Sequence, residues 1–245
     1  MRRVETVMGT TATVEIVDFG PPDRAAELAD EAFAILHEVD ARFSTYRADS
    51  EVSRVNAGEP VDPSPSLREV LARCTALWRQ TNGYFDAYAT GRLDPSGFVK
   101  GWAVQVASDR LLAAGAVNHC VDAGGDVRVR GHSSHGRPWR VGIRHPFERN
   151  AVCCVVAGTD LAVATSGVYE RGHHVLDPFT GAPARGLRSV TVVGTDLGEA
   201  DALATAALAM GEAGIAWLST LEGYASAVVT DDGRFLCSQN LPLAE

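Results

Sequence analysis

Residues 165–205 read TSGVYERGHHVLDPFTGAPARGLRSVTVVGTDLGEADALAT, and the rest of the chain is organised around this stretch. Small hydroxyl residues come first, followed by a His pair, an Asp-Pro turn signal, a β-branched strand over residues 189–194, and a helix that carries Asp201 and Thr205. Because Asp201 and Thr205 are four positions apart, they share one helix face. Oxygen donors on one face suit Mg²⁺ that is also held by a phosphate.

An ordinary structural role is the alternative for both residues. Asp201 could cap the N-terminus of its helix, since Asp is a favoured capping residue. The Thr205 hydroxyl could bond back to a carbonyl of its own helix. The pair alone therefore leaves both interpretations open.

Composition indicates which classes of protein this chain can belong to. The chain has 245 residues, enough for a sizeable core, and its net charge of -9 argues against binding to nucleic acid. It has no apolar run of membrane-spanning length and no apolar segment at its start, so a cytoplasmic location is expected. The cysteines follow no CxxC spacing, which indicates buried small side chains of a reduced protein. They are Cys74, Cys120, Cys153, Cys154 and Cys237.

Lys100 is the only lysine among 22 basic residues. A single lysine in an arginine-rich chain is a candidate for chemistry that needs a compact ammonium, such as phosphate binding. Its neighbours support this, because the Asp94-Pro95-Ser96-Gly97 turn signal precedes it and a helix is expected to follow. Chance retention of one lysine is the alternative.

The pattern of elements predicts an α+β fold with largely antiparallel sheets and packed helices, in one domain over residues 1–245. Strands and helices come in groups and not in strict alternation. Strands are expected as pairs over residues 4–18 and 117–129, and singly over 139–143, 151–157, 161–164, 189–194 and 224–230; helices are expected over residues 25–39, 67–80, 102–114, 213–221 and from 199 or 201 to 211.

Two loops could contact a ligand. The Met8-Gly9 dipeptide allows close backbone approach, although a β-bulge would explain the glycine equally well. Residues 43–56 are crowded with hydroxyl groups and contain Tyr46, so they could wrap a nucleotide. The alternative is a polar connection in which Asp49 or Ser50 caps a short helix. His132 and His135 lie in a Ser- and Gly-rich loop and are expected to face solvent.

Taken together, these stretches resemble the ApbE family, the Mg²⁺-dependent FAD:protein FMN transferases, and look closest to its short actinobacterial members. The resemblance runs from Met8 nearly to the end of the chain, and its specificity comes from the order and spacing of short motifs. They are Met8-Gly-Thr10, Ser44-Thr-Tyr46 with Asp49-Ser50 and Asn56, Gly83-Tyr-Phe-Asp86, Asp94 through Lys100-Gly101, Asp122-Ala-Gly-Gly-Asp126, Ala164-Thr-Ser-Gly167, His174-Val-Leu-Asp-Pro178 with Thr180-Gly181, and Asp201-Ala-Leu-Ala-Thr205.

The resemblance implies a T-fold-related core with an FAD cleft, and FMN transfer from FAD to a Ser or Thr hydroxyl of a target protein with release of AMP. It implies Mg²⁺, or Mn²⁺, held by Asp201, Thr205 and a backbone carbonyl for which Gly97 is the candidate. His174 would be the base, or would hold the turn at Asp177. The residues that fall where the family contacts FAD are Met8, Tyr46, Asp86, Lys100, Thr165 and Ser166.

Two departures and two alternative functions accompany the resemblance. The family loop often reads Asp-Leu-Gly-Gly-Ile-Ala, whereas this chain has Pro95, which lacks a backbone donor. Many members carry an export signal and a lipid anchor, which are not seen here. The same residues would also serve Mg²⁺-dependent FAD hydrolysis to FMN and AMP, or FAD binding without turnover. Loss of activity but not of binding in EDTA would separate the enzymes from the binding protein.

Overall fold

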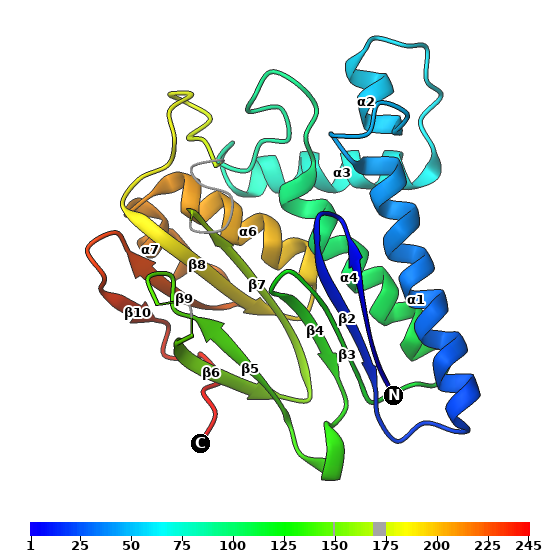
Figure 1. Ribbon diagram of the computed structural model, residues 1–245. Coiled ribbons are helices and arrows are strands. Elements are labelled where there is room, and N and C mark those ends of the chain that lie inside the picture. The colour runs from blue at the N-terminus through cyan, green and yellow to red at the C-terminus, as the bar shows by residue number, and fades with distance from the viewer. Residues whose placement is uncertain (149, 169–174) are drawn as a thin grey trace.

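The computed structural model describes residues 1–148, 150–168 and 175–245. At its centre is an eight-stranded sheet in the order β1-β2-β3-β4-β7-β8-β9-β10, in which every neighbouring pair is antiparallel (Figure 1). The strands are β1 (Arg2–Val7), β2 (Thr10–Ile16), β3 (His119–Ala123), β4 (Asp126–Arg130), β7 (Asp160–Gly167), β8 (Leu187–Gly194), β9 (Ala225–Thr230) and β10 (Phe235–Cys237). Both ends of the chain therefore supply strands to one sheet.

Helices cover one face of this sheet. They are α1 (Pro22–Phe43), α2 (Glu51–Asn56), α3 (Pro65–Gln80), α4 (Ser96–Ala113), α6 (Leu197–Met210) and α7 (Ala213–Leu218). Their apolar residues, such as Leu36, Phe98 and Leu203, form the main core with inward residues of the sheet such as Val121 and Val190. Among the described helices, none is long and apolar enough to cross a membrane.

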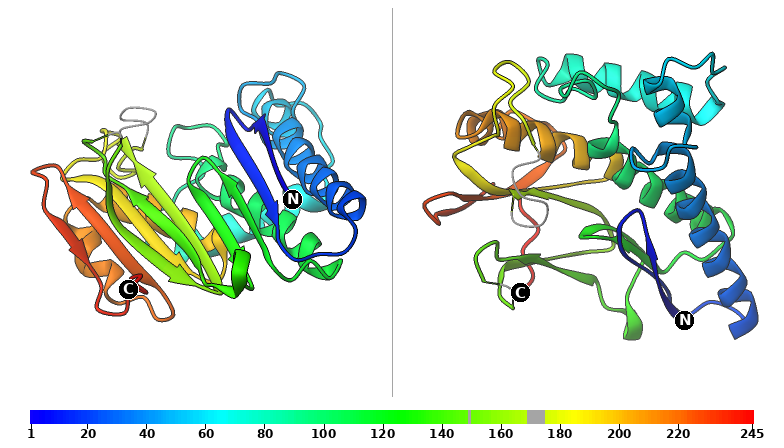
Figure 2. Two further views of the ribbon diagram at one scale, coloured as in Figure 1. Left: turned by 60° about the horizontal axis from the view of Figure 1, so that its bottom comes forward. Right: turned by 45° about the horizontal axis from the view of Figure 1, so that its top comes forward.

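A second, two-stranded sheet covers part of the opposite face. It consists of β5 (Trp139–Arg144) and β6 (Val152–Gly158). Trp139, Ile143 and Val156 of this sheet share a smaller core with residues of the main sheet such as Val129 and Val163. Figure 2 shows the resulting order of layers in its right-hand view, with helices above, the main sheet between, and β5–β6 below. The α+β prediction with antiparallel sheets is confirmed.

Two helices begin at residues that differ from the sequence prediction. Helix α6 begins at Leu197 because the Asp196 carboxylate accepts a hydrogen bond from the Glu199 N–H, so Asp201 is not the N-cap. Helix α4 begins at Ser96 and not at residue 102. Its N-cap residue is Pro95, which makes no side-chain cap bond, and in the turn before the helix the Asp94 carboxylate accepts from the Ser96 N–H at 3.1 Å. Lys100 therefore lies within α4, one turn after its start.

Other elements test the remaining expectations. Ser50, one of the two capping candidates that the sequence offered with Asp49, caps α2, and Gly211 ends α6 with a positive φ of 62°. The turn between β1 and β2 places Met8 and Gly9 at φ values of 53° and 69°, which is a two-residue hairpin turn and not a bulge. His132 and His135 are exposed, as expected.

The prediction of uniformly buried cysteines is wrong. Cys74 is buried, but Cys237 is exposed and the other three are half-buried. Cys237 belongs to β10, a short edge strand whose residues are all exposed. The sequence analysis did not predict this strand, because three residues after an Asp-Asp-Gly turn carry too little pattern.

His119 is a buried histidine that joins β3 to α4. Its Nε2 lies 2.7 Å from Ser108 Oγ and its Nδ1 lies 2.6 Å from the Ala116 carbonyl oxygen. A neutral ring satisfies both contacts if Nδ1–H donates to the carbonyl and Nε2 accepts from the Ser108 hydroxyl. Burial lowers the pKa of His119 from 6.5 to about 4.

This lowered pKa predicts a loss of stability in mild acid. Above pH 6.5 the ring is neutral in both the folded and the unfolded chain, and its contribution to the free energy of unfolding has its full value. As the pH falls from 6.5 toward 4, the unfolded chain gains a proton that the folded chain does not accept. The free energy of unfolding should therefore fall by about 3 kcal/mol over this range. Urea titrations of the wild type and His119→Gln at several pH values test this, because the variant should lose less stability; equal slopes would contradict it.

Candidate functional site

One large cavity, of about 1350 Å³, lies at the end of the sheet where the hairpin turns and the start of α4 meet. Elements far apart in sequence line it, including the β1–β2 turn, the start of α4, β5, β7 and α6. All of the described residues that the sequence analysis selected line this cavity. They are Met8, Tyr46, Asp86, Gly97, Lys100, Thr165, Ser166, Asp201 and Thr205.

Close packing of α4 against α6 brings Asp201 to the cavity. A Cβ atom on Gly101 would lie 2.4 Å from the Leu197 carbonyl oxygen and 2.9 Å from Asp201 Cβ. A Cβ on Gly198 would likewise lie 2.9 Å from a ring atom of Phe98. Only glycine at these two positions permits this helix separation, which lets the Gly101 N–H donate to Asp201 Oδ2 at 3.1 Å.

Lys100 stands between two carboxylates. Its ammonium forms an ion pair with Asp126 Oδ2 and lies 3.7 Å from Asp201 Oδ2. Asp126 is fully buried at the start of β4, and its other carboxylate oxygen accepts from the Thr165 N–H at 3.4 Å. Lys100 thus links α4, β4 and α6 electrostatically, which explains why a compact ammonium is retained here.

A row of hydroxyl groups continues the site along β7 and α6. Ser166 Oγ lies 2.9 Å from Thr205 Oγ1, and Thr165 Oγ1 lies 2.9 Å from Thr191 Oγ1 on β8. The Thr205 hydroxyl therefore contacts the neighbouring strand, and the alternative in which it bonds back to its own helix is not what the structure shows. These hydroxyls can each donate or accept, as binding to phosphate oxygens or a metal requires.

The start of α4 approaches the same hydroxyl. A Cβ on Gly97 would lie 3.2 Å from Thr205 Oγ1, so glycine lets the backbone come close to this side chain. The Asp201 carboxylate and the Thr205 hydroxyl lie one turn apart on α6, and both are oxygen donors of the kind that Mg²⁺ prefers. Within the described ranges, no three His, Cys, Asp or Glu side chains are grouped so as to hold a metal ion.

Three loops or turns form the rim. The Gly124 turn packs against the β2 strand, where a Cβ on Gly124 would lie 2.7 Å from Thr10 Oγ1. Tyr46 is 92% exposed, so the described residues leave its ring accessible to a ligand. Asp86 accepts a hydrogen bond from the Tyr88 N–H at 2.8 Å and stabilises its own turn.

A family model for the ApbE family matches residues 8–91 and 88–229, nearly the whole length of the chain. The chain belongs to the ApbE family. A relative named FAD:protein FMN transferase from Vibrio cholerae is 29% identical, over 84% of this chain and 80% of the relative. One of the same name from Haemophilus influenzae is 28% identical, over 84% and 79%. The solved flavin transferase ApbE from Vibrio cholerae has a TM-score of 0.83 at 26% identity, and the match covers 100% of this chain and 99% of that one.

This ApbE chain contains site features that the sequence analysis did not single out. Asp126 was quoted only within a motif, although a charged residue at the start of an apolar strand is a signal for a buried ion pair. Arg140 and Arg144 of β5 also line the cavity, and no sequence pattern placed β5 there. His174, the predicted base, lies outside the described residues.

A cysteine nucleophile is not supported in this ApbE chain. Cys120 of β3 lines the cavity, but burial raises the pKa of its thiol to about 12. The thiol therefore stays protonated at neutral pH and is a poor nucleophile. The cavity instead offers an ammonium, carboxylates and hydroxyls, which are groups able to contact a phosphate-bearing ligand.

Proposed function

We propose that this protein transfers FMN from FAD to a Ser or Thr hydroxyl of a target protein and releases AMP. The observation that carries the proposal is the meeting of Lys100, Asp201 and Thr205 in one large cavity of an ApbE-family chain. The relatives named FAD:protein FMN transferase support the reaction type. The proposed unit is the whole chain as one domain, since strands from both termini share the sheet.

The proposed reaction is a substitution at phosphorus. The target hydroxyl oxygen forms a bond to the FMN-side phosphorus of FAD, and the bond from that phosphorus to the bridging oxygen breaks. The hydroxyl loses its proton to a base, for which His174 is the proposed residue, and AMP leaves with the bridging oxygen. Positioning and electrostatic stabilisation supply most of the catalysis in such transfers.

Mg²⁺ fits the donor set of this chain. Asp201, Thr205 and the Gly97 carbonyl would hold it, and it would neutralise charge on the pyrophosphate and the departing AMP. The charges support this, because Asp126 and Asp201 carry two negative charges against one positive charge on Lys100. A pyrophosphate placed beside them adds negative charge, which a divalent cation offsets.

The remaining proposed contacts bind FAD. Lys100 offers a point charge to a phosphate or a flavin carbonyl, and the Thr165 and Ser166 hydroxyls offer donors beside it. Met8, Tyr46 and Asp86 stand at the rim, where they would contact other parts of the dinucleotide. A cavity of about 1350 Å³ exceeds the roughly 300–1,000 Å³ typical of small-molecule sites, which supports binding of a ligand as large as FAD.

AMP release with and without an acceptor tests this function. The protein is incubated with FAD and Mg²⁺, either alone or with a protein substrate of the Vibrio cholerae relative. We expect AMP release to require both the acceptor and the metal, and to stop in EDTA. Equal release of AMP and free FMN without acceptor would favour FAD hydrolysis, and tight FAD binding with no release would favour a binding protein.

A further inference from the structure

Strand β5 has one open edge, while both edges of its neighbour β6 are used. The Ala157 N–H of β6 donates to the Pro242 carbonyl, and the Ala244 N–H donates to the Val155 carbonyl, each at 2.8 Å. The last residues of the chain thus cover the outer edge of β6. Strand β6 lies between this segment and β5.

This bonding pattern fixes which groups of β5 face the open edge. In an antiparallel ladder, successive residues direct their N–H and C=O groups to alternate sides. Val155 and Ala157 direct theirs to the C-terminal segment, and their partners across the strands are Gly142 and Arg140. The backbone groups of Arg140 and Gly142 therefore point away from β6, and both residues are exposed. In the part of the chain that the structure describes, these groups have no hydrogen-bond partner.

The open edge belongs to the wall of the functional cavity. Residues 139–144 of β5 line the same cavity as Lys100 and Asp201. Sites for one small molecule measure roughly 300–1,000 Å³, and this cavity measures about 1350 Å³. The cavity exceeds that range, and one of its walls is a strand whose backbone groups are available.

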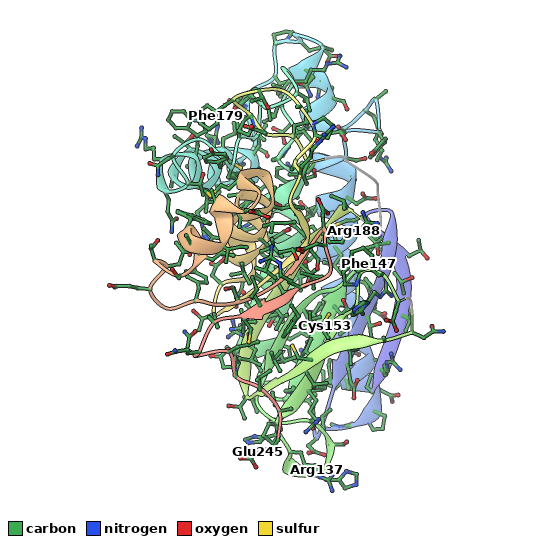
Figure 3. The ribbon with its side chains drawn as sticks, turned by 90° about the vertical axis from the view of Figure 1, so that its left-hand side faces the viewer. Arg137, Phe147, Cys153, Phe179, Arg188 and Glu245 are labelled. Carbon is green, nitrogen blue, oxygen red and sulfur yellow. The ribbon has the colours of Figure 1, made fainter. Side chains whose placement is uncertain are left out.

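The charge of β5 indicates the kind of partner. Arg140 and Arg144 are exposed on this strand, which has no acidic residue, and Arg137 precedes it. The Arg140 guanidinium donates one hydrogen bond to the Glu245 carbonyl oxygen at 3.2 Å. This basic character is local, because the chain carries a net charge of -9. Figure 3 shows Arg137 near Glu245 at one end of the β5–β6 sheet and Phe147 beside Arg188 toward the other. The exposed Phe147 ring, 5.2 Å from the Arg188 guanidinium carbon, adds apolar surface.

We propose that the open edge of β5 binds the acceptor segment of the target protein as an added strand, and that acidic residues flank its hydroxyl. The inference rests on the proposed function and extends it to the substrate class, an extended acidic segment. Main-chain hydrogen bonds to Arg140 and Gly142 provide the affinity, and the arginines select for acidic flanks.

A matched pair of substitutions tests the edge. Gly142→Pro and Gly142→Ala both add a Cβ, which would lie 3.1 Å from Val152 Cγ1, but only proline removes the outward N–H. The probes are short synthetic peptides with a central Thr and acidic, basic or uncharged flanks. Peptide binding is measured through the hydrogen exchange rate of the Arg140 amide in each variant, and of the Gly142 amide in the wild type and Gly142→Ala. FAD affinity is measured by flavin fluorescence.

We expect acidic peptides to protect both amides in the wild type and to bind about tenfold more weakly to Gly142→Pro than to Gly142→Ala. FAD affinity should be equal in these two variants. Arg140→Glu leaves the backbone intact. It should lower the affinity for acidic peptides about fivefold and leave the affinity for uncharged peptides unchanged. This second variant keeps the proposal testable if proline disturbs the strand.

The outcomes separate this proposal from the proposed function. Three results would overturn the edge proposal. The first is equal peptide affinity in Gly142→Pro and Gly142→Ala, and the second is that no peptide protects the amides from exchange. The third is weaker FAD binding in Gly142→Pro alone. The last result would assign the edge to FAD. FMN transfer to the peptides is measured in parallel by mass. If peptides bind but are never modified, the transfer function is refuted and the edge proposal stands. If peptides are modified but protect neither amide of β5 from exchange, the edge proposal is refuted and the transfer function stands.

Discussion

Asp201→Asn should lower the rate of FMN transfer by about a thousandfold. The substitution removes one negative charge from the proposed metal site and keeps an oxygen that can accept from the Gly101 N–H, so the α4–α6 contact is retained. The loss comes from weaker metal binding and weaker stabilisation of the departing AMP. Initial rates measured against Mg²⁺ concentration test this, together with the Mg²⁺ dependence of FAD affinity, which should be lost in the variant.

Asp196→Asn is the matched control for this prediction. Asp196 lies on the same helix terminus but serves as the N-cap of α6, and asparagine caps helices nearly as well. Its carboxylate pairs with Arg73 on the surface, so the cost in stability should be small. The transfer rate of this variant should stay within about twofold of the wild type, because surface substitutions of this kind change free energies little. Full Mg²⁺-dependent activity in Asp201→Asn would contradict the metal assignment.

Lys100→Met should lower the free energy of unfolding by about 3 kcal/mol. The methionine leaves the fully buried Asp126 carboxylate without its ammonium partner, and an uncompensated buried charge costs several kcal/mol. Urea unfolding at neutral pH measures the effect. The double variant Lys100→Met with Asp126→Asn should recover much of the loss, since it removes the charge together with its partner.

The contrast between these variants separates packing from electrostatics. If Lys100→Met loses no stability, then the Lys100–Asp126 pair does not compensate a buried charge. If the double variant is no more stable than Lys100→Met, then the loss comes from the lysine stem and not from Asp126. Transfer activity should stay low in both variants, because neither restores a positive charge beside Asp201.

The sequence predicted most elements because their signals are local. The turns at Met8-Gly9 and Gly124-Gly125 interrupt β-branched runs, and the structure places hairpins at both. Helix starts were less predictable, because the Asp196 cap of α6 and the turn at Asp94 before α4 both lie outside the apolar pattern. Motif order brought the predicted residues to one cavity, although their roles remain predictions.

Long-range relations could not be predicted from local pattern. Lys100 meets Asp126 only because α4 packs across β4, and the glycines that permit α4 to touch α6 look like ordinary helix interior positions. The alternating pattern of β5 predicted a strand but not its sheet. Its place in a separate two-stranded sheet, in which the C-terminal segment bonds to β6 and leaves the other edge of β5 open, is a long-range relation.

The most direct test of the central claim is the intact mass of an acceptor protein after incubation with this protein, FAD and Mg²⁺. The account predicts a gain of one FMN on a Ser or Thr of the acceptor, with one AMP released per modified acceptor, and no gain with Asp201→Asn. An acceptor of unchanged mass, while AMP and free FMN accumulate equally, would contradict FMN transfer and identify the cavity as a site of FAD hydrolysis.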